Sequence, residues 1–511
     1  MQTATTVARG AAALYAATVM TLVLNTLYLV LLTNYISLQA VGLVSLLNVV
    51  VVGVATLAVL ALPLSGSGVS ATPPAVTRFI SQYITGQGPA RRVYLLAVGV
   101  CSVLSLAAAF VISSPSIASL VAGPNETNVV FFASVDAVFY SFAQLGGYSM
   151  LGAGRATSAG KLMVASAVIR YVFASALLVL GFGPAGVFMG FAVGDAVMAA
   201  LANFYSYRVV EHARIEGASL KPVFAYMTSV FFAAAMGFAV SQTDKLLAFF
   251  QQGLGNLALY NIAAVGAAVA SFAPNAATNV LVPALSGQGS LDEQKRATLR
   301  TYTRYVTLTA APMGFGLAAV SPFLLRVFGD AYVSAAPLMA AISLSIALTA
   351  ITSVYSSSLL VDDRAHHFTV SSLAALVGLV VVAVLTVPAL GLMGIALGRS
   401  AMLFIMLGSV AYFVRRRRML VLDVAAYLKS IAASGIMAVF VFVALDSAEM
   451  MFAFGRVETV VAAAVMMPVG LVFYLGVMRW LKAFSLADVD FIEVLLPSWL
   501  RWFTRLARRL L

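Results

Sequence analysis

Runs of about 20 apolar residues recur along the whole sequence, and no other feature restricts its fold as strongly, because a helix of that length crosses a bilayer core. Hydrophobic residues make up 62% of the 511 residues and charged residues only 9%, whereas soluble globular domains are about 50% apolar. The sequence therefore predicts an all-α, polytopic membrane protein without a large soluble domain. We expect fourteen transmembrane helices, over residues 11–33, 38–64, 93–113, 129–151, 161–180, 185–207, 225–250, 258–282, 303–322, 333–360, 368–388, 391–414, 425–445 and 457–478.

The basic residues fall mainly on one side of this predicted topology. Of the 30 lysines and arginines, only Arg326 and Arg456 lie in loops of the opposite side, while Arg170, Lys245 and Arg399 lie within or at the edge of helices. Basic loops stay in the cytoplasm, so we expect a protein of the plasma membrane with both termini cytoplasmic. The net charge of +12 then reflects topology, and no nucleic-acid partner is expected.

The first twelve predicted helices form two sets of six with similar spacing. Gly190 and Gly194 in the sixth helix recur as Gly394 and Gly398 in the twelfth, at a constant offset of 204 residues. Because six is even, both sets have one orientation and are related by an axis along the membrane normal, as in transporters built from parallel repeats. The alternative is that glycine recurs by chance in apolar helices.

The repeat predicts four regions: an N-lobe over 1–212, a C-lobe over 213–418, two extra transmembrane helices over 419–480 and a cytoplasmic segment over 481–511. In the last segment Pro497 can start an amphipathic helix, which we expect to lie on the anionic inner leaflet. A helix that binds a protein partner is the alternative. The apolar face would hold Leu500, Phe503, Leu506 and Leu510, and the basic face Arg501, Arg505, Arg508 and Arg509.

Signatures of enzymes are missing from the sequence. The nearest approach to an ATP-binding loop, Gly154 to Lys161, has its glycines one residue too far apart and no hydroxyl residue after the lysine. His212, His366 and His367 lie in predicted cytoplasmic loops without cysteine or carboxylate partners that would suit a metal. The loops are too short for the catalytic carboxylates of a glycosyltransferase. We therefore expect no enzyme, no catalytic residues, no metal and no cofactor.

Charged residues at membrane depth are costly and are the first candidates for a functional site. Arg170 and Asp195 lie in adjacent predicted helices at equal distance from the turn between them, so they should share a depth near the midplane. A structural ion pair within the first bundle is one reading. In the other, Asp195 faces its repeat counterpart Arg399 across a central cavity, where Arg170 or Arg399 holds an anionic headgroup.

Further polar residues lie nearer the outer end or along helix faces. Asp136, Asp244 and Lys245 are expected near the outer end, and the Asp244-Lys245 pair is expected to end the seventh helix, as an anchor or as part of an ion-coupling site. In the first helix, Asn25 belongs to a polar stripe, which either lines a water-filled route or joins helices by hydrogen bonds. Its other members are Thr18, Thr21 and Tyr28, and the tenth helix has a similar stripe of Ser345, Thr349, Thr352 and Ser356.

Three motifs resemble a known family. They are Thr77-Arg78-Phe79-Ile80-Ser81 after the second helix, Asp244-Lys245-Leu246-Leu247 with Leu254-Gly255 and Ala258-Leu259-Tyr260 at the seventh and eighth, and Phe328-Gly329-Asp330-Ala331-Tyr332 before the tenth. This pattern is similar to that of polysaccharide flippases of the multidrug/oligosaccharidyl-lipid/polysaccharide exporter superfamily. The resemblance implies two six-helix lobes that open alternately to each side of the membrane and move a lipid-linked oligosaccharide outward.

The charges at membrane depth, the polar stripe and the motifs together provide the candidate residues. Arg170, Asp195, Arg399, Asn25, Asp136 and Arg78 are the substrate-cavity candidates, and Asp195 and Asp244 the ion-coupling candidates, with Na⁺ or H⁺ as the ion. Drug exporters of the superfamily often carry a carboxylate in the first helix, where this chain has Asn25. Flippases of the peptidoglycan precursor share the two extra helices but carry several arginines in the first lobe. A cation-coupled drug antiporter, a peptidoglycan-precursor flippase and a scaffold that recruits glycan enzymes remain the alternatives.

Overall fold

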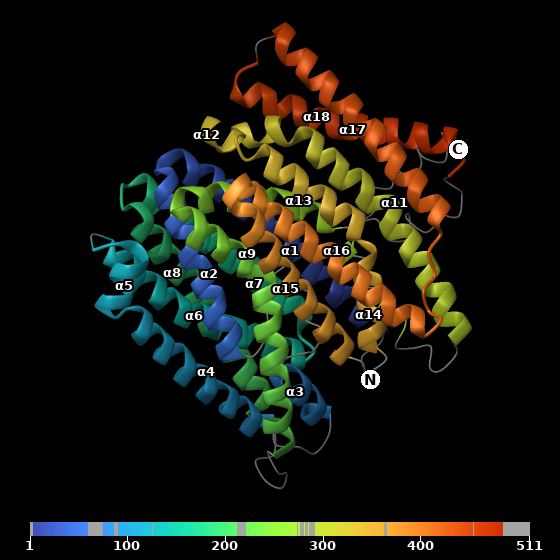
Figure 1. Ribbon diagram of the computed structural model, residues 1–511. Coiled ribbons are helices and arrows are strands. Elements are labelled where there is room, and N and C mark those ends of the chain that lie inside the picture. The colour runs from blue at the N-terminus through green and yellow to red at the C-terminus, as the bar shows by residue number, and fades with distance from the viewer. Residues whose placement is uncertain are drawn as a thin grey trace. The chain divides into compact units, whose positions relative to one another are not determined.

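The computed structural model describes residues 4–59, 75–85, 90–124, 126–211, 221–272, 274–275, 281, 285, 292–361, 365–452 and 454–483 (Figure 1). Across these ranges the regular secondary structure is helical, which confirms the predicted all-α class. Contacts divide the chain into two compact units, Met1–Ala258 and Leu259–Leu511. The boundary falls within one helix, α9. The lobe boundaries predicted from the sequence remain a prediction.

The first unit contains a bundle in which the helices predicted from the apolar runs are joined by two short ones. The short helix α3 has Val76, Phe79 and Ile80 buried and Arg78 exposed, so it is amphipathic, and its apolar spacing was the signal that sequence reasoning missed. The helices are α1 (Ala4–Tyr35), α2 (Leu38–Val59), α3 (Ala75–Thr85), α4 (Ala90–Ile112), α5 (Pro115–Ala122), α6 (Thr127–Gly152), α7 (Ala156–Val179), α8 (Gly183–Val210) and the first part of α9 (Lys221–Ala268).

The second unit begins with the end of α9 and continues to Trp480 and beyond. Its tenth span is bent by 50° between α13 and α14. The elements after α9 are η1 (Val269–Ser271), α11 (Asp292–Leu325), η2 (Arg326–Phe328), α12 (Asp330–Val333), α13 (Ala336–Thr349), α14 (Ile351–Val361), α15 (Ala365–Leu390), α16 (Leu392–Arg416), α17 (Val424–Phe452) and α18 (Arg456–Trp480).

The predicted count of fourteen membrane spans is not confirmed. The described residues contain 12 helices long and apolar enough to cross a membrane, or 13 with the bent pair α13–α14. The expected spans 225–250 and 258–282 lie in one long run, Val223–Ser271, whose helix is interrupted between them at Gly253 with φ of 79°, where the sequence leaves a gap between two helices. Asp244 and Lys245 therefore do not end a helix, as the sequence suggested, because α9 continues past them to the break at Gly253.

Glycine pairs bring neighbouring helices into close contact in both units. A Cβ atom on Gly194 would lie 2.6 Å from the backbone nitrogen of Arg170, and one on Gly394 would lie 2.6 Å from that of Val387. Such distances are too short for any side chain, so α8 can approach α7, and α16 can approach α15, only through glycine. The glycines that recur at an offset of 204 residues thus allow the same close helix contact in the pair α7–α8 and in the pair α15–α16.

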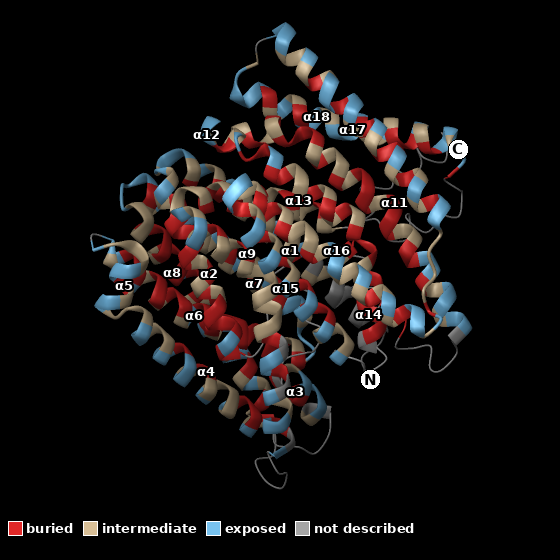
Figure 2. Cartoon of the chain, viewed as in Figure 1, coloured by how far each residue is buried: buried red, intermediate tan, exposed pale blue. Residues whose placement is uncertain are grey.

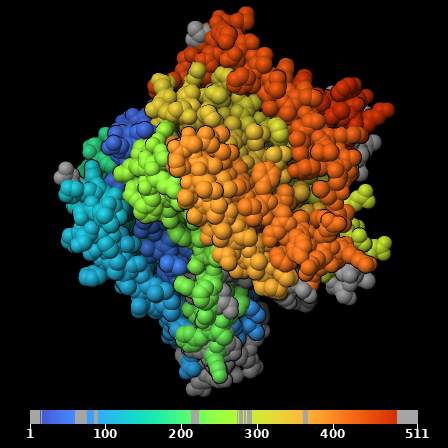
Figure 3. All heavy atoms as spheres, viewed as in Figure 1, coloured from blue at the N-terminus to red at the C-terminus, as the bar shows by residue number. Residues whose placement is uncertain are grey.

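The pair α17–α18 is attached to α11 and to the short helices η2 and α12 that follow it. Arg304 donates to Asp423 at 3.0 Å and Arg456 to Asp330 at 2.6 Å, and Arg326 pairs with Glu449. Between these ends, the Tyr474 hydroxyl donates to the Leu308 carbonyl at 3.1 Å and lies 2.9 Å from the Ser430 hydroxyl. The two extra helices are therefore a fixed part of the second unit, on whose surface they lie (Figure 3).

Residues are buried where helices pack together and exposed on outer faces of the helices (Figure 2), and the exposed residues include large apolar ones. Phe110 is 81% exposed on α4 and Met450 is 79% exposed on α17. Exposure of large apolar side chains on many helices to water is unfavourable, whereas the hydrocarbon of a bilayer accommodates them. The described helices therefore have the surface of a multi-pass membrane protein. The predicted amphipathic helix over 497–511 lies outside the described residues.

Candidate functional site

Three charged side chains meet in the interior of the first unit, one from each of α6, α7 and α8. Arg170 Nη1 on α7 donates to Asp195 Oδ2 on α8 at 2.8 Å, and Arg170 Nη2 lies 4.0 Å from Asp136 Oδ2 on α6. The side chain of Asp136 is fully buried, and those of Asp195 and Arg170 are 6% and 13% exposed. We call Asp136, Arg170 and Asp195 the charged cluster.

The local sequence explains how the charged cluster forms. Gly194 precedes Asp195 and lets α8 touch the backbone of α7 at Arg170, so the two side chains can pair over a short distance. Asp136 lies nine residues after the start of α6, and Arg170 nine residues before the end of α7. At a rise of about 1.5 Å per residue both are roughly 14 Å from the same end of the bundle. Asp136 was expected nearer the outer end than Arg170, and the structure corrects this prediction.

Aromatic rings enclose the arginine of the charged cluster. The Arg170 guanidinium carbon lies 3.9 Å from the ring centre of Phe191 and 5.3 Å from that of Tyr140, both within cation–π range. Tyr28 on α1 stacks on Tyr171 at 5.3 Å and meets the edge of Phe191 at 5.4 Å. The guanidinium thus lies between two carboxylates and two aromatic rings, from α6 and α8, and the rings of Tyr28 and Tyr171 pack next to this group.

Several polar atoms at the charged cluster are buried without a hydrogen-bond partner. They are both carboxylate oxygens of Asp136, Nε of Arg170 and the hydroxyl of Tyr28. Buried polar atoms are normally paired, so unpaired atoms gathered around one cluster suggest a place where a proton, a water molecule or a ligand group is bound.

Of the polar stripe predicted on α1, Tyr28 lies at this site. Tyr28 belongs to the cluster's aromatic surroundings, whereas Asn25 is half-buried and the Thr18 hydroxyl bonds back to the Leu14 carbonyl at 2.9 Å. The stripe therefore faces the interior of the first unit at Tyr28. Whether Asn25 lines a cavity remains a prediction.

The other predicted residues of the first unit lie apart from the charged cluster. Asp244 is 3% exposed on α9, and its Oδ1 accepts a hydrogen bond from the Lys245 backbone amide at 2.9 Å. Arg78 is exposed on α3, with its guanidinium 4.4 Å from the ring centre of Tyr226. Their roles in ion coupling and substrate binding remain predictions.

Arg399 lies in the second unit, half-buried on α16 directly after Gly398. The neighbouring Ser400 accepts a hydrogen bond from Ser345 of the α13 stripe at 2.6 Å. This bond shows the stripe joining two helices there, which was one of its two readings. The placement of Arg399 opposite Asp195 remains a prediction.

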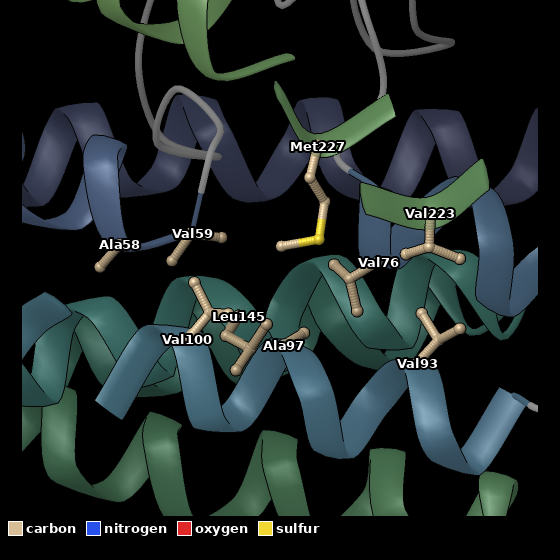
Figure 4. A pocket seen from close by; sticks show the side chains of 9 residues that line it. All are labelled: Ala58, Val59, Val76, Val93, Ala97, Val100, Leu145, Val223 and Met227. Carbon is tan, nitrogen blue, oxygen red and sulfur yellow. The ribbon is translucent and has the colours of Figure 1, made fainter. Parts of the chain in front are cut away.

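An apolar pocket opens elsewhere in the first unit, between α2, α3, α4, α6 and α9 (Figure 4). In Figure 4 the side chains of Val76, Val93, Val223 and Met227 point toward one another from three of these helices. The residues that line it carry no charge, so the pocket suits hydrocarbon rather than a headgroup.

Metal-binding geometry is not found among the described residues, where no three His, Cys, Asp or Glu side chains come together. The rings of His366 and His367 lie 4.0 Å apart, and His367 stacks on Phe413 at 4.3 Å. This pair packs against an aromatic ring and lacks further ligands in that part of the chain.

The described helices are those of a multi-pass membrane protein, and comparisons with known proteins agree. A family model described as "Polysaccharide biosynthesis protein" matches residues 89–337. This match agrees with the resemblance seen in the sequence motifs. No curated protein matches the chain in sequence.

Solved structures of transporters share the fold. The lipid II flippase MurJ in an inward closed conformation matches with a TM-score of 0.69 and 14% identity, covering 92% of this chain and 99% of MurJ. A MATE transporter of Vibrio cholerae matches with a TM-score of 0.58 and 13% identity, over 81% of this chain and 99% of that one. An outward-facing multidrug resistance MATE transporter of the MOP superfamily matches with a TM-score of 0.55 and 17% identity, over 80% and 95%. The chain therefore has the fold common to these transporters.

Proposed function

We propose that this chain is a flippase of the multidrug/oligosaccharidyl-lipid/polysaccharide exporter superfamily. It moves a lipid-linked oligosaccharide or polysaccharide precursor from the cytoplasmic to the outer leaflet by alternating access. The observation that carries the proposal is the polysaccharide-biosynthesis match over residues 89–337 within a fold shared with a lipid II flippase. Neither match by itself indicates the substrate, but together they favour a lipid-linked glycan.

The extra helices support a flippase over a drug exporter. The match to the lipid II flippase covers 92% of this chain, and the matches to the MATE transporters cover 80% and 81%. The difference is close to the length of the pair α17–α18, which runs from Val424 to Trp480. A drug exporter remains the second candidate, because both MATE transporters share the fold of most of the chain.

The driving force follows from electrostatics. A pyrophosphate-linked headgroup is anionic, and the negative-inside potential favours its outward movement by about 2.3 kcal/mol per charge per 100 mV. An arginine that faces the cavity lowers the cost of taking this headgroup out of water. We assign this role to Arg399 in the second unit, with Arg170 in the first, and an initial contact on the cytoplasmic side to Arg78, whose side chain is exposed. Asn25 is the proposed polar contact on α1.

The test is translocation of a fluorescent lipid-linked oligosaccharide in liposomes that contain the purified protein. An external sugar-modifying enzyme scores the lipids that have reached the outside, and liposomes without protein are the control. Protein-dependent movement is the expected result. Absence of movement, with exchange of a cationic dye under a pH or Na⁺ gradient, would replace the flippase by the drug antiporter.

A scaffold for glycan enzymes predicts a different outcome after removal of residues 497–511, which lie outside the described residues. A transporter keeps substrate movement in liposomes when this segment is removed, because the predicted cavity is formed by the two lobes. A scaffold has no movement either before or after the deletion. The deletion therefore separates the two functions without an assumption about the substrate's glycan.

A further inference from the structure

The apolar pocket of the first unit begins next to a group of arginines (Figure 4). Val93, which lines the pocket on α4, directly follows Arg91 and Arg92. Val76, which lines it on α3, comes two residues before Arg78. We call Arg78, Arg91 and Arg92 the basic rim. A pocket that suits hydrocarbon therefore adjoins a concentration of positive charge.

Aromatic side chains hold two arginines of the basic rim in place. The Arg78 guanidinium lies 4.4 Å from the ring centre of Tyr226, which is one turn after the pocket residue Val223 on α9. Arg91 Nη2 donates to the Tyr207 hydroxyl at 3.1 Å. Both contacts leave N–H donors of the guanidinium groups available. Guanidinium groups held in this way match the geometry of a phosphate.

Acidic residues lie far from the basic rim on the helices that line the pocket. Helices α2, α3 and α4 contain none, and those of α6 and α9 are Asp136 and Asp244. Asp136 is nine residues from the pocket residue Leu145, and Asp244 is seventeen from Met227, or about 14 and 26 Å along the helices. No ion pair of the described residues involves the basic rim. Its charge is therefore available to an anion from outside the chain.

The depth of the pocket matches one leaflet of a bilayer. Val100, the last pocket residue on α4, is eight residues from Arg92, or about 12 Å along the helix. The hydrocarbon of one leaflet is about 15 Å thick, half of a core of roughly 30 Å. The basic rim lies on the side that the sequence predicts to be cytoplasmic, and the cytoplasmic leaflet contains anionic lipids. A lipid whose phosphate meets the basic rim therefore has its acyl chain at the level of the pocket.

We infer that the basic rim and the apolar pocket bind one anionic phospholipid of the cytoplasmic leaflet, with the phosphate at the arginines and part of one acyl chain in the pocket. The pocket is narrow, which suits a straight acyl chain, whereas the polyprenyl chains of lipid-linked glycans carry methyl branches and are wider. The bound lipid contacts α3, α4 and α9 together, so it stabilises the packing of the first part of α9 within the first unit.

The lipid site does not depend on the proposed flippase function. Arg78 is also the proposed first contact of the transported headgroup, so lipid binding is measured directly on the purified protein and not through transport. A protein that retains the phospholipid but moves no lipid-linked oligosaccharide keeps this site and loses the flippase proposal.

Titration with phosphatidylglycerol, followed by native mass spectrometry, tests the basic rim. We expect one tightly bound phosphatidylglycerol and weaker binding of phosphatidylcholine with the same chains. Arg78→Ala should weaken phosphatidylglycerol binding about fivefold, equal to the contribution of about 1 kcal/mol from one arginine near anionic headgroups. Arg416→Ala is the matched control and should leave binding unchanged. Arg416 is also exposed, and its guanidinium lies 4.8 Å from the ring centre of Tyr412 in the second unit.

A second variant tests the acyl chain. Ala97→Leu adds an isopropyl group to the wall of the pocket on α4 and should weaken phosphatidylglycerol binding about fourfold for each methylene group that it excludes. Ala107→Leu is the control, because Ala107 is exposed on the same helix. Equal melting temperatures of the two variants without added lipid show that the pocket is filled and the fold intact.

Four results would overturn the site. Equal binding of phosphatidylcholine and phosphatidylglycerol excludes a role for the basic rim. Displacement of phosphatidylglycerol by millimolar inorganic phosphate reduces the site to a phosphate site without a chain. Binding of a polyprenyl pyrophosphate that Ala97→Leu weakens to the same extent assigns the pocket to the transported lipid. If neither Arg78→Ala nor Ala97→Leu changes phosphatidylglycerol binding, the phospholipid lies elsewhere.

Discussion

Gly194 and Arg170 are in direct contact across two helices, since a Cβ atom on Gly194 would lie 2.6 Å from the Arg170 backbone nitrogen. The contact is between backbones, which cannot move aside without shifting a helix. The neighbouring residue, Asp195, makes its 2.8 Å bond to Arg170 only because of this close approach. Packing and the charged cluster are therefore coupled at one glycine.

Replacement of Gly194 by alanine should destabilise the protein. The added methyl group separates α7 from α8 and lengthens the Arg170–Asp195 bond, at a cost of about 1–3 kcal/mol in the free energy of unfolding. Gly99→Ala on α4 is the control, because a Cβ there meets nothing within 4 Å. Thermal unfolding in detergent measures both variants. Equal melting temperatures for the two would show that α7 and α8 adapt to the methyl group.

Removal of the buried arginine should cost far more than removal of an exposed one. Arg170→Ala leaves two buried carboxylates without a cation, and breaking a buried pair costs about 3–5 kcal/mol. Arg456→Ala removes a pair whose side chains are 51% and 74% exposed, for which about 0–1 kcal/mol is expected.

A second substitution tests the reason for this difference. Adding Asp195→Asn to Arg170→Ala removes one of the stranded charges and should recover part of the lost stability. Chemical denaturation of reconstituted protein provides the free energies of unfolding. If the double variant is less stable than Arg170→Ala alone, stranded charge is not the cause of the loss.

The apolar runs were sufficient to predict the all-α class and the position of most helices. They left the break at Gly253 in the gap between the expected spans 225–250 and 258–282, but they did not predict that the first of these helices continues through a polar pair. Asp244 and Lys245 resemble a helix end in sequence, but the break lies at Gly253, where φ is 79°, a conformation open to glycine and costly for other residues. The bend of 50° between α13 and α14 occurs beside Ala350, without proline or glycine, so it depends on tertiary packing that no local pattern encodes.

The candidate site was predicted in part. Equal distance from one turn placed Arg170 and Asp195 at one depth, and the ion pair is present. Asp136 was expected elsewhere, because its depth depends on where α6 begins, and Thr127 is not a distinctive start signal. The role of Tyr28 in enclosing the cluster was not foreseen, since a ring contact between α1, α7 and α8 arises only from their packing.

Arg399→Ala should reduce the movement of an anionic lipid-linked substrate. If Arg399 holds the headgroup, loss of its charge raises the cost of moving the anion through a low-dielectric region, and we expect about a tenfold lower rate, equal to about 1.4 kcal/mol. Arg399→Lys keeps the charge and should retain most of the rate. Liposome translocation of the fluorescent lipid measures all three proteins.

The control for Arg399 is Arg456→Ala, which removes the first residue of α18, an arginine paired with the exposed Asp330 at the start of α12. Its rate should remain within about twofold of the wild type, since exposed ion pairs contribute little. If Arg399→Ala moves the lipid at the wild-type rate, Arg399 does not contact the substrate. Its half-buried position would then reflect helix packing alone.

Tyr474→Phe should loosen the attachment of α17 and α18 to α11. The hydroxyl links Ser430 of α17 to the Leu308 carbonyl of α11 at 2.9 and 3.1 Å, and such bonds between membrane helices contribute about 0.6–2 kcal/mol. Tyr412→Phe is the control, because Tyr412 is 51% exposed. Stability in detergent should fall by that amount for Tyr474→Phe only. If lipid translocation falls in parallel, the two extra helices take part in transport, and if only stability falls, they act as a support for the second unit.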